Sequence, residues 1–127
     1  MGAFCFPGQA TQKAGHRTGG MKESEIMKAI MIEASRLGAR LFRNNVGVLR
    51  DNRGNYIRYG LCPGSSDLVG WTPEGRFLAV EIKRPGKYPT PMQEAFLQAI
   101  SQSGGRAFVA HSLDEFNKEF SRCQPTN

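Results

Sequence analysis

Residues 67–83 read DLVGWTPEGRFLAVEIK, and this stretch has the sequence pattern of a β-hairpin. Two apolar runs, DLVGW and FLAVEIK, flank a short segment that contains Pro73 and Gly75, both typical of turns. A loop centred on these two residues sets a register in which Asp67 lies opposite Glu81. Directly paired residues have Cβ atoms roughly 4.5–5.5 Å apart, and like charges at that distance repel. The sequence therefore predicts a pair of facing carboxylates that calls for a cation.

The charged end of this hairpin has the composition of a metal site. Carboxylate oxygens are hard ligands that suit Mg²⁺ or Mn²⁺, and Mg²⁺ often takes only one or two of them. Its other positions are then available to water and substrate phosphate. Lys83 shares a strand face with Glu81 and could orient an attacking water or neutralise charge developing on phosphorus. The joint pattern favours phosphodiester hydrolysis, although a Glu-x-Lys at the end of a strand is on its own usually a solvated surface.

Length and composition bound the class of protein. The chain has 127 residues, of which 39% are hydrophobic and 22% charged, as expected for one globular domain with its own core. No apolar run approaches the roughly 20 residues of a membrane span, and we identify no secretory signal. Its three widely spaced cysteines fit neither a disulfide framework nor a zinc site, so free thiols in a reducing cytoplasm are expected. The net charge of +6 favours a polyanionic partner such as nucleic acid.

Three segments are expected along the chain. Residues 1–20 show no periodicity and are predicted to be a flexible extension, residues 21–122 form the folded domain, and residues 123–127 are a loose tail. The predicted order in the domain is a helix, three or four strands, a helix, a strand and a helix. A final strand-helix-strand unit predicts a parallel pair, so we expect an α/β fold with a mixed central sheet flanked by helices.

Caps and stops delimit the predicted helices. The first is expected over residues 23–37, with Ser24 as its N-cap. The second runs from Pro91 to about Ser103, and Thr90 begins its capping box. Ser112 opens a third helix by the same kind of motif.

Basic and polar residues gather around the hairpin. Arginine and asparagine side chains can bind phosphate oxygens, tyrosine rings can stack on bases, and a Gly-Ser loop can present its backbone N–H groups to phosphate. A solvated strand face and simple turn chemistry would explain the same residues. The predicted DNA contacts are Arg43, Asn44, Asn45, Ser65, Ser66, Arg84 and Lys87, with Tyr56 and Tyr59 as stacking candidates.

Five pieces of the sequence together resemble one nuclease family. They read SEIMKAI, FRNNVG, GLCPGSSDLVG, FLAVEIKRPGKYPTPMQEAFL and GGRAFVA, and cover nearly all of the expected domain. Their order and motifs are similar to those of the VRR-NUC domain, the virus-type replication-repair nuclease of the PD-(D/E)XK superfamily. Ser66 stands where the superfamily motif has proline, a departure that many members share. The resemblance implies a restriction-endonuclease-like fold, and it is closest to small stand-alone members typical of bacteriophages, which would act in the cytoplasm of a bacterial host.

This resemblance also implies an activity and a set of roles. Members hydrolyse phosphodiester bonds in DNA with Mg²⁺ or Mn²⁺, and the small forms act as homodimers on branched substrates, including Holliday junctions. A nucleic-acid-binding module without catalysis is the alternative. The implied metal ligands are Asp67, Glu81 and the backbone carbonyl of Ile82, the implied catalytic lysine is Lys83, and the implied assisting residues are Gln93 and Glu25.

Overall fold

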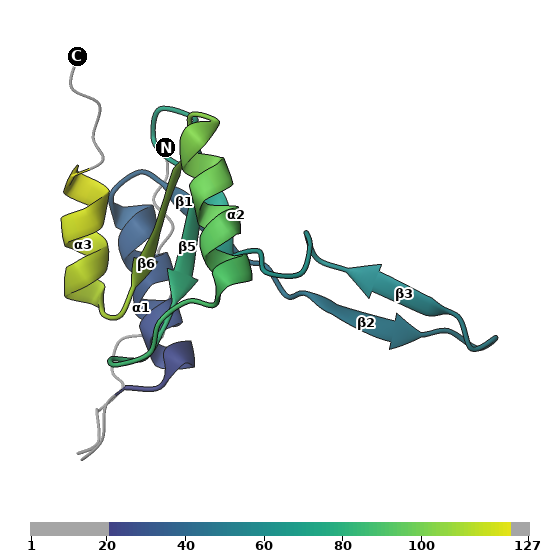
Figure 1. The fold of residues 1–127 in the computed structure, drawn as a ribbon. Coiled ribbons are helices and arrows are strands. Elements are labelled where there is room, and N and C mark those ends of the chain that lie inside the picture. The colour runs from purple at the N-terminus through teal and green to yellow at the C-terminus, as the bar shows by residue number, and fades with distance from the viewer. Residues whose placement is uncertain (1–20, 123–127) are drawn as a thin grey trace.

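The computed structural model describes residues 21–122, which form a mixed α/β domain (Figure 1). Three helices and six strands follow one another in the order α-β-β-β-β-β-α-β-α, which confirms the predicted fold class. The helices are α1 (Glu23–Arg36), α2 (Pro91–Gln102) and α3 (Leu113–Arg122). The strands are β1 (Arg40–Arg43), β2 (Gly47–Arg50), β3 (Tyr56–Tyr59), β4 (Leu68–Trp71), β5 (Phe77–Ile82) and β6 (Arg106–Ala110).

Four of the strands form the central sheet, in the order β1-β4-β5-β6. The first two pairings are antiparallel, and β5 pairs with β6 in parallel, as the strand-helix-strand pattern predicted. In the β4–β5 hairpin Leu68 pairs with Val80 and Trp71 with Phe77, which is the predicted register. The turn closes where the Thr72 N–H donates to the Arg76 carbonyl at 2.9 Å.

Helices cover the two faces of the sheet unequally. Helices α1 and α3 pack on one face and bury the core there, as alternate apolar residues of the strands predict. On the other face α2 packs mainly against β5 and β6. The β1–β4 half of that face therefore stays uncovered and carries the half-exposed rings of Phe42 and Trp71, whose centroids are 5.6 Å apart. We call this half of the sheet the open face.

The strands β2 and β3 leave the body of the domain altogether. They pair with each other in antiparallel fashion as a separate two-stranded sheet, which projects away from the helices (Figure 1). We call residues 47–59 the arm. None of these residues is buried. Because both faces of the arm meet solvent, β2 lacks the alternation that marks a half-buried strand, and the sequence did not predict it.

Two details differ from the sequence predictions. Five strands separate α1 from α2, rather than three or four, and the additional strand is β2. The N-cap of α1 is Lys22 rather than Ser24, because the Glu25 carboxylate accepts a hydrogen bond from the Lys22 backbone N–H at 3.1 Å. The helix thereby begins two residues earlier than an N-cap at Ser24 would place it.

The expected extension and tail, residues 1–20 and 123–127, lie outside the described residues. Within residues 21–122, no helix has the length and apolar composition needed to cross a bilayer. The one cysteine in this part, Cys62, is an exposed free thiol, as the cysteine spacing predicted.

Candidate active site

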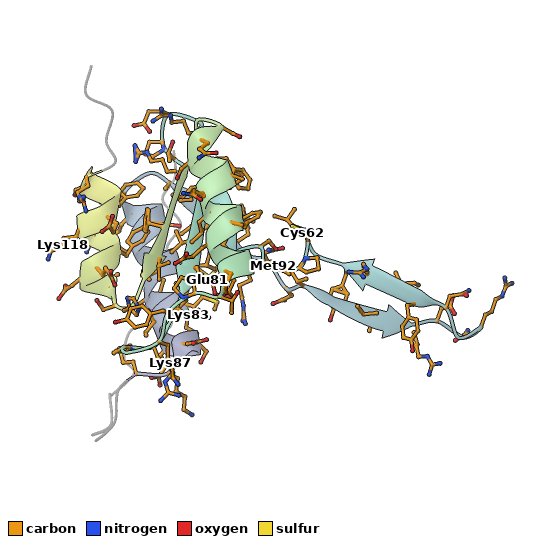
Figure 2. All side chains as sticks on the ribbon, viewed as in Figure 1. Cys62, Glu81, Lys83, Lys87, Met92 and Lys118 are labelled. Atoms are coloured by element: carbon orange, nitrogen blue, oxygen red, sulfur yellow. The ribbon has the colours of Figure 1, made fainter. Side chains whose placement is uncertain are left out.

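The hairpin register brings Asp67 and Glu81 together at one end of the central sheet. Asp67 immediately precedes β4, and Glu81 lies near the end of β5. The Asp67 Oδ2 atom accepts a hydrogen bond from the Ile82 N–H at 3.0 Å, which fixes its carboxylate beside the facing strand. Glu81, which Figure 2 labels, is only 2% exposed. The structure thus forms the predicted carboxylate pair and buries one of its members.

The Glu81 carboxyl group has an unusual electrostatic environment. Burial is the largest effect and the Asp67 charge the next, and together they raise the pKa of Glu81 to about 7. Lys83 opposes this shift, because its Nζ atom lies 3.7 Å from the Glu81 Oε2 atom. The other carboxylate oxygen, Oε1, is buried and has no hydrogen-bond partner among the described residues. A buried acceptor without a partner is costly, so this atom indicates the place of a missing positive group.

These residues fit a hard divalent cation. Within residues 21–122, no group of three or more histidine, cysteine, aspartate or glutamate side chains is placed to hold a metal. Mg²⁺ does not require such a group, because it commonly uses one or two carboxylates and completes its octahedron with water and phosphate oxygens. Zn²⁺, by contrast, prefers three or four nitrogen and sulfur ligands, which this site lacks.

Two helices begin at the same end of the sheet. The N-termini of α1 and α2 lie near the C-terminal end of β5 (Figure 1). Helix N-termini carry partial positive charge, which favours phosphate in this region. Gln93 lies in the first turn of α2, where its Oε1 accepts from the Thr90 N–H at 2.9 Å and its N–H donates to the Thr90 hydroxyl at 3.2 Å. The predicted capping box is confirmed.

Glu25 lines a shallow pocket on α1. The pocket has a volume of about 240 Å³ and also includes Arg43 at the end of β1. The Glu25 carboxylate accepts the hydrogen bond from the Lys22 backbone N–H described above. Glu25 and Arg43 thus come together at the margin of the sheet. The role of Glu25 at the carboxylate pair stays a prediction.

Asn44 joins the base of the arm to the site. Its Nδ2 donates to the Ser65 hydroxyl at 2.7 Å and to the Ser66 carbonyl at 2.8 Å, while its Oδ1 accepts from the Leu61 N–H at 3.2 Å. Its backbone N–H donates to the carbonyl of Asp67 at 2.8 Å. Asn44, which precedes the arm, therefore binds both Leu61, which follows the arm, and Asp67 of the carboxylate pair.

The residues predicted to contact DNA fall into two groups. Ser65 and Ser66 are buried, and their hydroxyls donate to the carbonyls of Cys62 and Leu68. As placed, these hydroxyls and the Asn44 side chain stabilise the loop, and their contact with DNA stays a prediction. The side chains of the other group are exposed and available to a ligand: Arg43, Asn45, Arg84 and Lys87.

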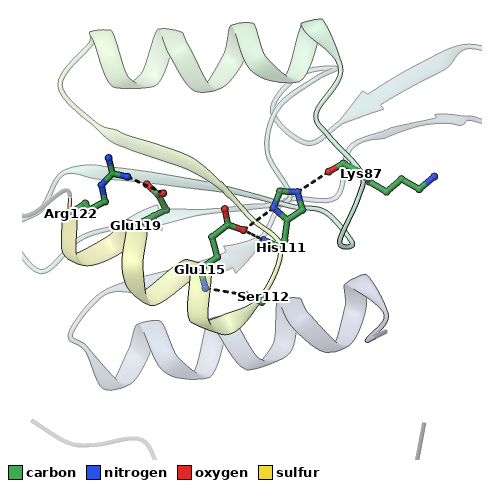
Figure 3. A network of polar contacts seen from close by, with 6 residues as sticks. All are labelled: Lys87, His111, Ser112, Glu115, Glu119 and Arg122. Carbon is green, nitrogen blue, oxygen red and sulfur yellow. Dashed lines mark hydrogen bonds and ion pairs between the residues drawn. The ribbon is translucent and has the colours of Figure 1, made fainter. Parts of the chain in front are cut away.

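A histidine that the sequence did not single out positions the basic loop of residues 84–89. The His111 Nε2 atom lies 2.7 Å from the Lys87 carbonyl, and Nδ1 lies 2.7 Å from the Glu115 Oε1 atom (Figure 3). The Glu115 carboxylate also accepts the His111 backbone N–H at 2.7 Å. The Ser112–Glu115 capping pattern was the available signal, because it places Glu115 four residues after His111, in the first turn of the helix.

Comparisons with known proteins agree on one family. The model of the VRR-NUC domain matches residues 16–114. Two solved structures are similar to this chain. One, a "VRR_NUC domain", is 21% identical with a TM-score of 0.57, and the match covers 80% of this chain and 97% of that one. The other, a "VRR_NUC domain protein", is 20% identical with a TM-score of 0.52, and covers 82% and 88%. No curated protein matches the chain.

The family model spans both the Asp67–Glu81 hairpin and the first two helices that meet beside it. The structural matches show the same fold over most of each chain. The sequence motifs, the sheet that pairs the two carboxylates and the family match agree, and the chain belongs to the VRR-NUC domain family of nuclease-type domains.

Proposed function

We propose that this protein is a Mg²⁺- or Mn²⁺-dependent endonuclease that hydrolyses phosphodiester bonds in DNA. The observation that carries the proposal is the Glu81 carboxyl group, which is buried beside Asp67 with its Oε1 atom unpartnered and with Lys83 at 3.7 Å from its Oε2 atom. Strongly perturbed ionisable groups of this kind concentrate at functional sites. A structural ion pair would not need the second carboxylate.

The proposed work of the site divides between a cation and the chain. Asp67, Glu81 and the Ile82 carbonyl would hold the ion, which when bound polarises the scissile phosphate and activates water. Lys83 holds a positive charge next to Glu81, where it can orient the attacking water and offset negative charge on the phosphate. Ile82 keeps the Asp67 carboxylate in place through its N–H.

Surrounding residues have proposed supporting roles. Gln93 would position water or phosphate at the start of α2, and Glu25 would approach the cation from α1. The exposed side chains of Arg43, Asn45 and the basic loop would bind the DNA backbone, because guanidinium and ammonium groups contact phosphate oxygens at any sequence.

Cleavage assays test this function directly. The wild-type protein is incubated with labelled linear and branched DNA in Mg²⁺, in Mn²⁺ and in EDTA. We expect Lys83→Ala and Glu81→Gln to lower the cleavage rate about 10²–10⁴-fold, the usual range for loss of a proton-transfer or charge-stabilising group. Lys118→Ala removes an exposed lysine from α3 and serves as the control. Divalent-independent binding without cleavage by the wild type would instead identify a non-catalytic binding module.

The preferred substrate and assembly are the finer part of the proposal. We propose that the enzyme selects branched DNA, such as a four-way junction, and acts as a homodimer. The open face supports the assembly, because Phe42 and Trp71 are each 49% exposed on a sheet half that no described helix covers. A two-fold dimer would present two sites to two strands. Cleavage mapping on a synthetic junction, with sedimentation of the same sample, tests both points.

A further inference from the structure

We propose that one face of the arm binds the DNA duplex beyond the cleaved bond, as a second anchoring surface of the enzyme. This inference rests on the proposed nuclease function. It assigns a role to an element that the carboxylate site does not use.

The arm has no evident part in folding the domain. It pairs with no strand of the central sheet, and none of its residues enters the core. An isolated two-stranded hairpin is marginally stable in water. The contribution of the arm to the core therefore does not explain why the chain contains it. A projecting hairpin of this kind indicates a binding role.

The register sorts the side chains of the arm onto two faces. Val48 pairs with Arg58 and Arg50 with Tyr56, so these four residues share one face, which we call the arginine face. The opposite face carries Leu49, Ile57 and Tyr59. Like every strand residue of the arm beyond Gly47, the residues of both faces are exposed.

The arginine face has uncompensated positive charge. The Arg50 guanidinium stacks over the Tyr56 ring at 5.1 Å from its centroid, an arrangement that leaves its N–H edge available to phosphate. Arg58 lies diagonally across the strands, where side chains are about 7–8 Å apart. The face contains no carboxylate.

The only acid of the arm is engaged elsewhere. Asp51 Oδ1 accepts the backbone N–H groups of Arg53 and Asn55, each at 2.8 Å, and these bonds form the turn at the tip. Hydrogen bonds from the Asn55 and Arg53 backbone lower the pKa of Asp51, so it stays ionised in this role. Among the described residues, this carboxylate forms no ion pair with Arg50 or Arg58, because both of its oxygens bind the turn at the tip.

Charge selects DNA as the partner of this face. A duplex carries one negative charge per ~1.7 Å of its axis, which complements a paired guanidinium surface. A second copy of this chain would bring an equally positive arginine face, so charge disfavours contact between two such faces. The Asn44 contacts hold the base of the arm to the residues around Asp67, so DNA on the arm is continuous with DNA at the site.

Salt dependence of DNA binding tests the proposal without relying on cleavage. Binding of a labelled linear duplex is measured in EDTA at several NaCl concentrations. Each lost phosphate contact reduces the slope of log K against log salt by ~0.9, so Arg50→Ala/Arg58→Ala should reduce it by about 1.8. If the two proteins bind equally at ~1 M salt, this slope difference makes binding by the arm variant about sixtyfold weaker at ~0.1 M salt. Arg36→Ala/Arg122→Ala removes two exposed arginines from α1 and α3 and controls for net charge.

The outcomes separate the arm from the active site. A reduced slope in the arm variant alone supports the proposal, even if the wild type never cleaves DNA with Mg²⁺, a result that would remove only the proposed nuclease function. The proposed role of the arm is overturned if the wild type cleaves DNA but the arm variant keeps the wild-type slope. A slope equal to that of the control variant leads to the same conclusion. The same conclusion follows if Leu49→Ser/Ile57→Ser, and not the arginine variant, weakens binding, because the apolar face would then carry the interaction.

Discussion

The surroundings of the Glu81 carboxyl group keep it protonated up to near-neutral pH when no cation is bound. Its pKa is raised from 4.5 to about 7 by burial and by Asp67. The folded protein therefore binds a proton that the unfolded chain releases at lower pH, and stability falls as pH rises from about 4.5 to 7.

The first prediction concerns the free energy needed to ionise the buried Glu81 carboxyl group in the folded protein. In EDTA at pH 8, Glu81→Gln should raise the free energy of unfolding by up to about 3 kcal/mol relative to wild type, because it removes a buried charge. The difference should disappear near pH 4, where the wild-type carboxyl group is neutral. Urea denaturation at the two pH values measures it. Equal stability of both proteins at pH 8 would show that the pKa of Glu81 is not raised by folding. Mg²⁺ should stabilise only the wild type, because the variant lacks one carboxylate ligand.

A second buried charge lies at the opposite end of the sheet from this site. Arg106 at the start of β6 is 3% exposed, and among the described residues none of its three side-chain nitrogens has a hydrogen-bond partner. Its Nη2 lies 3.8 Å from a Glu74 oxygen, and the guanidinium group stands over the Phe120 ring. The partial ion pair compensates only part of the desolvation cost.

We therefore predict that Arg106→Met stabilises the domain by about 1–2 kcal/mol, since a flexible apolar chain replaces a poorly paired charge against Phe120. Thermal and urea unfolding measure the change. Arg106→Lys serves as the comparison, because it keeps a buried charge and loses the planar group. A loss of stability in the methionine variant would mean that the contacts of the guanidinium with Glu74 and Phe120 outweigh its desolvation cost.

At the scale of elements, His111 joins the basic loop to α3. Burial lowers the pKa of His111, but the Lys87 carbonyl and the Glu115 carboxylate together outweigh it, and the net pKa is raised. The protonated ring can donate to both acceptors at once. The contact therefore stabilises the loop below the ordinary histidine pKa of ~6.5, and this stability is lost as pH rises through the raised pKa.

The corresponding prediction is a loop that loosens with pH. Hydrogen exchange of the Lys87 and Tyr88 amides should accelerate more steeply above pH 7 than that of amides in α2, after correction for intrinsic rates. His111→Gln should remove the difference, and an NMR titration should give a His111 pKa above the ordinary histidine value of ~6.5. If the Lys87 and Tyr88 amides exchange at the same rates in the wild type and in His111→Gln, contacts other than those of His111 order the loop.

The elements differ in how far the sequence predicted them. The β4–β5 hairpin was predicted to its register, because Pro73 and Gly75 define a turn and buried alternation defines the faces. Strand β2 was not predicted, since its pairing with β3 satisfies the backbone while neither face is buried. The contacts of Asn44 were also out of reach, because they join residues about twenty positions apart through a loop whose shape composition does not specify.

For the whole molecule, the sequence predicted the class of fold and the position of the carboxylate pair. The raised pKa of Glu81 could not be predicted, because it depends on how completely the sheet and helices exclude water around one side chain. The unequal covering of the sheet was likewise hidden, since Phe42 and Trp71 have the apolar character of core residues. The arm and the open face were therefore found only in the assembled structure.

The open face also supplies a built-in optical reporter. Trp71 is the only tryptophan of the 127-residue chain and is half exposed there, beside Phe42. If two copies pair through this face, raising the protein concentration should shift the fluorescence emission to shorter wavelength as water leaves the indole ring. Phe42→Ser should displace that transition to higher concentration, and a dimer that sediments without any shift would have to form elsewhere. Association can thus be followed in the unlabelled protein, under the same solution conditions as the proposed cleavage assay.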